Sequence, residues 1–408
     1  MKILFLMSQY LPYGMANTIC AIKYANALKA HNHKVDFVSI TQKFTDVDYL
    51  DKDSKVYFID NYLTKLQKKY NSEKLPKTAV FFAKIKTRIK SMFCKNTKNF
   101  LVDFVDTKKL IKIASDGYDA IVSVSEPLAI QNLAYKIKSK IKNIKWYPLF
   151  LDPLVYNYNS KEFGTKRIKN KAEKLLQKAD KIFAVYGIKK ENEKLKYLPN
   201  YHSKMVDIYL PSLVEPNVEN KNLDSGKNEK EIKMLYAGMF HEKVRNPKKM
   251  FDLLEKVKVD NANFVCIGYG CEDAINAFDP KSIKFNYLNK QPYSVVVNNI
   301  LDSDILINLG NSVPNQMPSK VLEYISYGKP IINFVLNFEE ISVDILKKYD
   351  LSYNFNLNTY TQEDIRNLEK FIQESKGKSL TFEEIKKLLP DLVYPNVCEK
   401  FVQEITNG

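Results

Sequence analysis

Short apolar runs alternate with longer amphipathic segments along this chain. The apolar runs in the first half predict buried strands at residues 2–7, 35–40, 118–124, 145–151 and 181–185. The amphipathic segments between them predict helices at residues 18–31, 128–142 and 172–180. Strands that alternate with helices in this way form a mostly parallel sheet wound on both faces. The first half therefore predicts an α/β domain.

The same alternation begins again after residue 231. Further strands are predicted at residues 232–238, 263–268, 283–288 and 304–309. Further helices are predicted at residues 246–257, 294–301, 341–348, 362–374, 382–388 and 396–405. Between the two halves lies the polar segment EPNVENKNLDSGKNEKE, which is typical of a linker. We therefore predict an N-terminal domain at 1–214, a linker at 215–231, a C-terminal domain at 232–394 and a closing helical segment at 395–408.

Residues 304–334, DILINLGNSVPNQMPSKVLEYISYGKPIINF, hold the densest candidate chemistry. They predict a strand, a polar loop, a helix capped by Ser319 and a second strand after Gly328. A free helix N-terminus, including the Val321 N–H, and the cation of Lys320 suit a phosphate. Glu323, one turn further, is placed to accept hydrogen bonds from a vicinal diol such as a ribose. The alternative is that Lys320 and Glu323 are solvated residues of an amphipathic helix.

The run Pro-Ser-Lys-x-x-Glu-Tyr at 318–324, followed by Gly-Lys-Pro at 328–330, resembles a known family. It is similar to the donor-binding region of retaining GT-B glycosyltransferases of family GT4, in the bacterial capsular, exopolysaccharide and O-antigen branch. The resemblance implies two Rossmann-like, doubly wound parallel-sheet domains facing a cleft. The acceptor would bind in the N-terminal domain and the nucleotide sugar in the C-terminal one. The last helix would cross back to the N-terminal domain.

The resemblance also implies roles for individual residues. In the family, the glutamate at the position of Glu323 holds the donor ribose, and a second glutamate eight residues earlier contacts the sugar. That earlier position is Asn315 here. Basic residues after the first strand of the C-terminal domain would grip the diphosphate, with Arg245 the main candidate and Lys243 the second. A guanidinium binds phosphate oxygens bidentately. The alternative is that both are solvent-facing loop cations.

Glycines occur at the ends of several predicted strands. Gly238, Gly268 and Gly270 permit close approach of a base or a phosphate, and we expect Tyr293 to frame the base with the last two. Gly14 lies in the first turn, where the family brings glycine close to the donor phosphates and the acceptor. Each of these glycines has an ordinary explanation as well, a backbone position that needs positive φ.

Asp152 follows the strand predicted at residues 145–151. In the family, the residue after this strand is commonly a histidine that contacts the donor sugar. The carboxylate of Asp152 would orient a sugar hydroxyl or the acceptor, or it would cap the loop.

The charge balance is strongly basic, with 63 Lys and Arg against 47 Asp and Glu and a net charge of +16. Such a charge favours a polyanionic partner. Residues 79–95, AVFFAKIKTRIKSMFCK, combine an apolar stripe with flanking cations, which is typical of an interfacial membrane helix. The membrane candidates are Phe82, Lys84, Ile85, Arg88, Ile89 and Phe93. A core-facing helix, or a strand over residues 84–90, would also fit the pattern. No aromatic strand motif accompanies the charge, so we expect no nucleic-acid partner.

Other features bear on compartment and metals. No apolar run approaches the ~18–20 residues of a membrane span. The five cysteines are scattered, which indicates a reducing compartment. Cys266 and Cys271 have no histidine nearby, and Asp302-Ser303-Asp304 reads as the end of a helix, so we expect no metal and no cofactor. We expect a cytoplasmic protein, peripheral on the inner face of the cell membrane.

The sequence thus predicts a hexosyltransferase-type enzyme in bacterial surface polysaccharide biosynthesis, with Asp152, Arg245 and Asn315 nearest the chemistry. Its partners would be a nucleotide sugar, UDP-linked, and a saccharide or lipid-linked acceptor. Two alternatives remain. A non-catalytic GT-B subunit would bind a partner glycosyltransferase or a polysaccharide without turnover. A nucleotide-sugar epimerase on the same fold would make a new nucleotide sugar without any acceptor.

Overall fold

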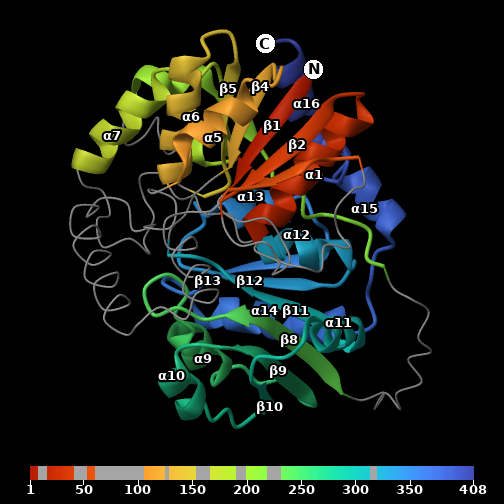
Figure 1. The fold of residues 1–408 in the computed structure, drawn as a ribbon. Helices are drawn as coiled ribbons and strands as arrows, with labels where there is room; N and C mark the ends of the chain where they lie inside the picture. The colour runs from red at the N-terminus through yellow and green to blue at the C-terminus, as the bar shows by residue number, and fades with distance from the viewer. Residues whose placement is uncertain are drawn as a thin grey trace, which may run out of the picture. The chain divides into compact units, whose positions relative to one another are not determined.

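The computed structural model describes residues 1–7, 16–40, 53–59, 105–124, 128–152, 166–189, 199–217, 231–312 and 319–408. The chain forms two compact units (Figure 1). Unit 1 comprises Met1–Pro211 and Val397–Gly408, and unit 2 comprises Ser212–Asn396. Each unit is a parallel sheet flanked by helices, which confirms the predicted fold class of two doubly wound α/β domains.

The sheet of unit 1 has seven parallel strands in the order β3-β2-β1-β4-β5-β6-β7. Its strands are β1 (Lys2–Met7), β2 (Lys34–Ser39), β3 (Val56–Phe58), β4 (Ala120–Val124), β5 (Lys145–Phe150), β6 (Ile182–Val185) and β7 (Met205–Ile208). Its helices are α1 (Ala16–Ala30), α5 (Thr107–Ala114), α6 (Leu128–Lys140), α7 (Lys166–Leu176), the 3-10 turn η1 (Pro199–Lys204) and α16 (Glu399–Thr406). Helix α1 contacts α16, and α6 contacts both α5 and α7, so the helices form two groups around the sheet.

The last helix of the chain packs into unit 1. Phe401 of α16 is fully buried, and its ring centroid lies 4.6 Å from that of Tyr24 on α1 and 4.5 Å from that of Phe183 on β6. At the rim of this contact the Lys181 ammonium lies 2.7 Å from the Glu404 carboxylate. Helix α16 therefore fills one side of the unit 1 core.

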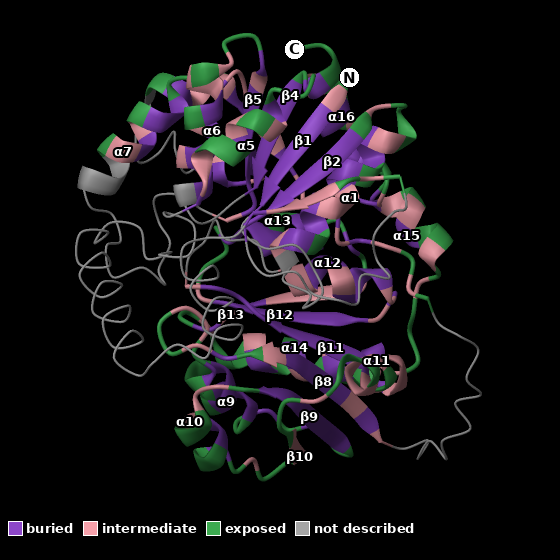
Figure 2. Ribbon diagram, viewed as in Figure 1, coloured by how far each residue is buried: buried purple, intermediate pink, exposed green. Residues whose placement is uncertain are grey.

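The sheet of unit 2 has six parallel strands in the order β10-β9-β8-β11-β12-β13. Its strands are β8 (Ile232–Met239), β9 (Ala262–Tyr269), β10 (Ile283–Leu288), β11 (Ile305–Leu309), β12 (Ile331–Val335) and β13 (Ser352–Asn356). Its helices are α9 (Lys248–Leu254), α10 (Glu272–Ala277), α11 (Tyr293–Asp302), α12 (Ser319–Ser326), α13 (Ile341–Leu346), α14 (Gln362–Ser375) and α15 (Phe382–Leu388), and the turn η2 (Asn396–Cys398) spans the boundary to unit 1. The central strands of both sheets are buried almost throughout, whereas the edge strands β3, β10 and β13 are mostly half-buried (Figure 2).

Three asparagines lie on one row across the last three strands of this sheet, β11, β12 and β13. In the strand register, Asn333 of β12 lies beside Asn308 of β11 and Asn354 of β13. The Asn308 amide donates to the Asn333 oxygen at 2.7 Å, and the Asn333 amide donates to the Asn354 oxygen, also at 2.7 Å. Each buried amide thus finds a partner on the neighbouring strand, as buried polar groups require.

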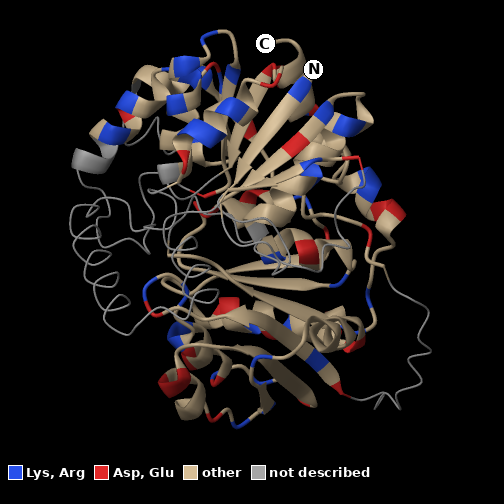
Figure 3. Cartoon of the chain, in the orientation of Figure 1, with Lys and Arg blue, Asp and Glu red and all other residues tan. Residues whose placement is uncertain are grey.

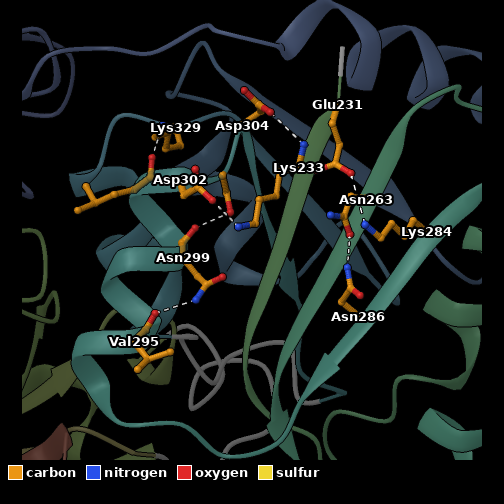
Figure 4. Close-up of polar contacts among 12 residues, drawn as sticks. Glu231, Lys233, Asn263, Lys284, Asn286, Val295, Asn299, Asp302, Asp304 and Lys329 are labelled. Atoms are coloured by element: carbon orange, nitrogen blue, oxygen red, sulfur yellow. Dashed lines mark hydrogen bonds and ion pairs between the residues drawn. The ribbon is translucent and has the colours of Figure 1, made fainter. Parts of the chain in front are cut away.

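The amino-terminal edge of the unit 2 sheet carries a different polar cluster (Figure 4). Lys233 places its ammonium 2.5 Å from the Asp302 carboxylate, and its backbone N–H donates to Asp304 at 2.9 Å. Helix α11 ends at Asp302 and Ser303 caps it. The Asp302-Ser303-Asp304 run is therefore the end of a helix, as predicted, and its carboxylates pair with a lysine.

The structure adds elements that the sequence did not predict, namely β3, α5, β7, α10 and β13. Helix α7 (Lys166–Leu176) begins and ends several residues earlier than its predicted range of 172–180. Leu213, which we expected in the N-terminal domain, forms a bridge with Val393 in unit 2. Within the described ranges, no helix combines the length and the apolar character that crossing a membrane requires. The same ranges contain no group of three or more His, Cys, Asp or Glu side chains arranged to hold a metal ion.

Candidate functional site

The loop after β8 is closed on itself and tied to the loop after β11. The backbone N–H of Arg245 donates to the His241 carbonyl at 2.8 Å, and the backbone N–H of His241 donates to the Arg245 carbonyl at 3.0 Å. Ser312 donates its backbone N–H to the Val244 carbonyl at 2.7 Å and its hydroxyl to the Lys243 carbonyl at 2.8 Å. The two loops therefore form one fixed platform at the carboxyl edge of the sheet, where ligands of such folds bind.

Arg245 is held on this platform by its side chain. Its Nε and Nη2 atoms donate to the Asn311 Oδ1 atom at 3.1 and 2.8 Å. The guanidinium also hydrogen-bonds Tyr236, whose pKa is raised by burial and lowered in part by the Arg245 charge. None of the described carboxylates forms an ion pair with Arg245. The side chain of Lys243, by contrast, is exposed.

Helix α12 is fixed to the end of β8 by one buried side chain. The Tyr324 hydroxyl accepts from the Ala237 N–H and donates to the Ala237 carbonyl, each at 3.1 Å. Its pKa is raised by burial, and both Glu323 and Arg245 act on it electrostatically. Tyr324 therefore links the helix that carries Glu323 to the strand that leads to Arg245.

The beginning of α12 differs by one residue from the prediction. Ser319 is the first residue of the helix rather than its cap. Val321, whose N–H the sequence suggested for a phosphate, is fully buried. The sequence placed the cap one position late because Ser is common both at the cap and in the first turn.

Glu323 is oriented by two neighbours. The Lys320 ammonium lies 2.8 Å from Oε2, and the Tyr293 hydroxyl donates to Oε1 at 3.4 Å. Tyr293 opens α11 and is 65% exposed, while the Glu323 and Lys320 side chains are partly buried. The Glu323 carboxylate contributes to raising the pKa of Tyr293, after the partial burial of the phenol. The structure thus brings together three side chains that the sequence singled out separately.

Gly268 and Gly270, at the end of β9, are required by backbone packing, whereas a Cβ atom at Gly238 would meet only the Tyr236 side chain, at 3.1 Å. A Cβ atom at Gly268 would lie 1.9 Å from the Gly238 carbonyl oxygen, and one at Gly270 would lie 2.4 Å from the Phe240 oxygen. Gly270 also has a φ of +91°, which L-residues with a side chain rarely adopt. The close approach at these glycines is by the protein's own backbone, which alone explains them.

Asp152 lies in unit 1, just after β5. Its carboxylate accepts a hydrogen bond of 2.7 Å from the amide of Asn17, in the first turn of α1. This contact gives Asp152 a structural partner at the start of that helix. Gly14, Asn315 and the membrane candidates at 82–93 lie outside the described residues.

The sequence analysis missed Glu340, which caps α13 after β12. It is 1% exposed, and burial raises the pKa of its carboxyl to about 8. The signal available was a carboxylate shortly after a buried strand and directly before an apolar helix. This signal could not single out Glu340, because the adjacent Glu339 is also a carboxylate between the strand and the helix, yet it is exposed.

No protein-family model and no curated protein sequence matches the chain. Solved structures match it over its whole length. The lipopolysaccharide outer core galactosyltransferase WaaB in its apo form is 14% identical, with a TM-score of 0.62 over 100% of this chain and 99% of that chain. Sucrose-phosphate synthase from Thermosynechococcus elongatus is 12% identical, with a TM-score of 0.65 over 100% of this chain and 99% of that chain.

An alpha-glucosyltransferase in complex with UDP is 14% identical, with a TM-score of 0.55 over 100% of both chains. At such identities the likeness concerns the fold. Two parallel sheets of seven and six strands, each flanked by helices, match these enzymes along the full chain. The chain therefore has the fold of the GT-B glycosyltransferases.

Proposed function

We propose that this protein is a hexosyltransferase-type glycosyltransferase that uses a nucleotide diphosphate sugar, with UDP as the nucleotide. The observation that carries the proposal is that Arg245, which forms no ion pair with a described carboxylate, and the oriented Glu323 are both held in place on unit 2. They follow the carboxyl ends of β8 and β11, which are neighbours in the sheet, and Tyr324 connects them. A guanidinium suits a diphosphate and a fixed carboxylate suits a ribose diol. The fold, and the UDP bound in one structural neighbour, support this assignment.

In this proposal, catalysis comes from positioning the donor and stabilising its leaving group. The departing diphosphate gains negative charge as the bond to the sugar breaks. Arg245, Lys243, Lys320 and the first turn of α12 would supply fixed positive charge to it. Transfer with retention at the anomeric carbon is the outcome implied by the resemblance to family GT4.

We propose a saccharide or lipid-linked acceptor in surface polysaccharide biosynthesis, bound at an anionic membrane surface. Supporting this, the helices α5, α6 and α7 of unit 1 carry many basic side chains (Figure 3). Exposed lysines on these helices or directly after them are Lys108, Lys109, Lys112, Lys136, Lys140, Lys142, Lys174 and Lys178. Each basic residue near an anionic leaflet contributes about 1 kcal/mol.

Calorimetric titration with UDP, GDP, ADP and CMP tests the donor assignment. We expect micromolar binding of UDP and loss of most of that affinity in Glu323→Ala. Glu374→Ala is a matched control, because Glu374 also pairs with a lysine one turn away on a unit 2 helix. Binding that is unchanged in Glu323→Ala would refute the assignment of the ribose site.

Sedimentation with lipid vesicles tests the membrane proposal. We expect binding to vesicles that contain phosphatidylserine and none to pure phosphatidylcholine, with binding reduced at high salt. Replacing Lys108, Lys109 and Lys112 by glutamate should weaken it, whereas Lys370→Glu on unit 2 should not. Equal binding to both kinds of vesicle would contradict an electrostatic membrane surface.

The second candidate function is a non-catalytic GT-B subunit, which Asn315 favours because the family often has a glutamate there. It predicts stable association with a partner and no donor turnover. Release of UDP from a UDP sugar in the presence of membrane lipids distinguishes the two. Product analysis without an acceptor would reveal an epimerase.

A further inference from the structure

Glu340 directs its carboxyl toward the end of β11 rather than toward solvent. A Cβ atom at Gly310 would lie 1.9 Å from Oε2 of Glu340, so the carboxyl occupies the space beside that glycine. Oε1 accepts a hydrogen bond of 2.8 Å from the Ser342 hydroxyl. Oε2 is buried and has no hydrogen-bond partner among the described residues. The carboxyl is thus completely enclosed and only half satisfied.

One residue joins this carboxyl to the candidate diphosphate cation. The side-chain oxygen of Asn311 holds Arg245 through two hydrogen bonds, and the backbone N–H of Asn311 points to the Glu340 carboxyl. The same Ser342 hydroxyl that donates to Glu340 accepts a hydrogen bond of 3.1 Å from the buried side-chain amide of Asn333. Glu340 therefore contacts Asn311, the residue whose side chain holds Arg245 in place.

The charge state of Glu340 follows from this enclosure. Burial raises the pKa of the carboxyl to about 8, against the opposing effects of Ser342, Asn311 and the Arg245 charge. Among the described residues, Arg245 is the charged group whose charge lowers the pKa of the Glu340 carboxyl. The nearby carboxylates Glu339, which precedes Glu340 in the chain, and Asp344 on α13 are exposed. At neutral pH the carboxyl is therefore mostly protonated and does not offset the positive charge of Arg245.

We propose that Glu340 is a positioning residue that must hold a proton for the diphosphate to bind at Arg245, and that its ionisation weakens the site. This inference rests on the proposed donor function. An ionised carboxylate behind Asn311 would offset the field of the guanidinium, and a bound diphosphate would in turn oppose ionisation. Binding and proton retention are therefore linked, and diphosphate binding takes up a proton.

The test is calorimetric titration of the full chain with UDP at pH 8 in two buffers of different ionisation enthalpy. UDP itself is ionised there, because a terminal phosphate has a pKa of about 6. We expect uptake of about half a proton by the wild type, because the free site is near its midpoint. Glu340→Gln should show no uptake, and Glu339→Gln, on the exposed neighbour, should behave like the wild type. At pH 9, UDP should bind Glu340→Gln about tenfold more tightly than the wild type, with no difference at pH 6.

Each outcome decides a separate point. UDP binding without proton uptake in the wild type, or with equal uptake in Glu340→Gln, overturns the role of Glu340 and leaves the donor site standing. No binding of UDP or pyrophosphate by the wild type at pH 6 refutes the donor site and this inference together. The wild-type measurement needs no folded variant, so poor folding of Glu340→Gln would not remove the test.

Discussion

The Tyr324 hydroxyl bonds both the N–H and the carbonyl of Ala237, each at 3.1 Å, and so fixes a helix to a strand through one atom. Tyr324→Phe removes both bonds while keeping the ring. We expect the free energy of unfolding to fall by about 1–3 kcal/mol, because buried backbone groups lose their partner. Denaturant unfolding measures this loss, with Tyr269→Phe on the exposed surface as the control. Equal stability of the two variants would contradict the link.

Gly310→Ala places a methyl group where the Glu340 carboxyl lies. We expect a loss of about 1–3 kcal/mol in the free energy of unfolding, since the enclosed carboxyl has little room to move. In a Glu340→Ala background the same change should cost much less, and a double-mutant cycle measures that coupling. Additive effects would show that the two side chains do not compete for space.

The raised pKa of Glu340 makes stability depend on pH. Between its ordinary value of 4.5 and about 8, the folded state holds a proton that the unfolded state releases. Its contribution to stability is therefore complete below pH 4.5 and is lost as the pH rises to about 8. Glu340→Gln cannot ionise, so its stability relative to the wild type should grow from pH 5 to pH 9. Denaturant unfolding at both pH values measures this, and a constant difference would be inconsistent with a buried neutral acid.

Phe401→Ala should destabilise unit 1, although residue 401 is far in sequence from the rest of that unit. Its ring packs on Tyr24 and Phe183 in the buried core. We expect a loss of about 3–5 kcal/mol in the free energy of unfolding, typical of removing a buried aromatic ring. Gln403→Ala on the exposed side of the same helix is the control. A similar small effect for both would mean that α16 adds little to the core.

The central strands could be predicted from the sequence because they are apolar on both faces, as β1 and β4 show. The strands missed, β3, β7 and β13, lie at the ends of the two sheets, where pairing on one side only permits short or polar segments. In β13, SYNFN, the polar Asn354 is satisfied by Asn333 of another strand. No local pattern carries that information.

The candidate site was likewise predictable only where its residues lie close together in the sequence. Lys320 and Glu323 share one helix, so the sequence could place them one turn apart, and the structure adds the ion pair between them. Asn311 and Glu340 act on Arg245 from other loops, and a contact across long sequence separation leaves no local signature. Gly268 and Gly270 lie beside backbone from a neighbouring strand and loop, a contact that the sequence could not show.

The row of asparagines in unit 2 also specifies how its strands align. If β12 slipped by one residue, Asn333 would lose Asn308 and Asn354 and would face aliphatic and aromatic neighbours instead. Two or more amides would then be buried without partners, at a cost of several kcal/mol. Apolar side chains on both faces distinguish neighbouring alignments of a strand only weakly, so these three amides act as a marker that only the native alignment satisfies.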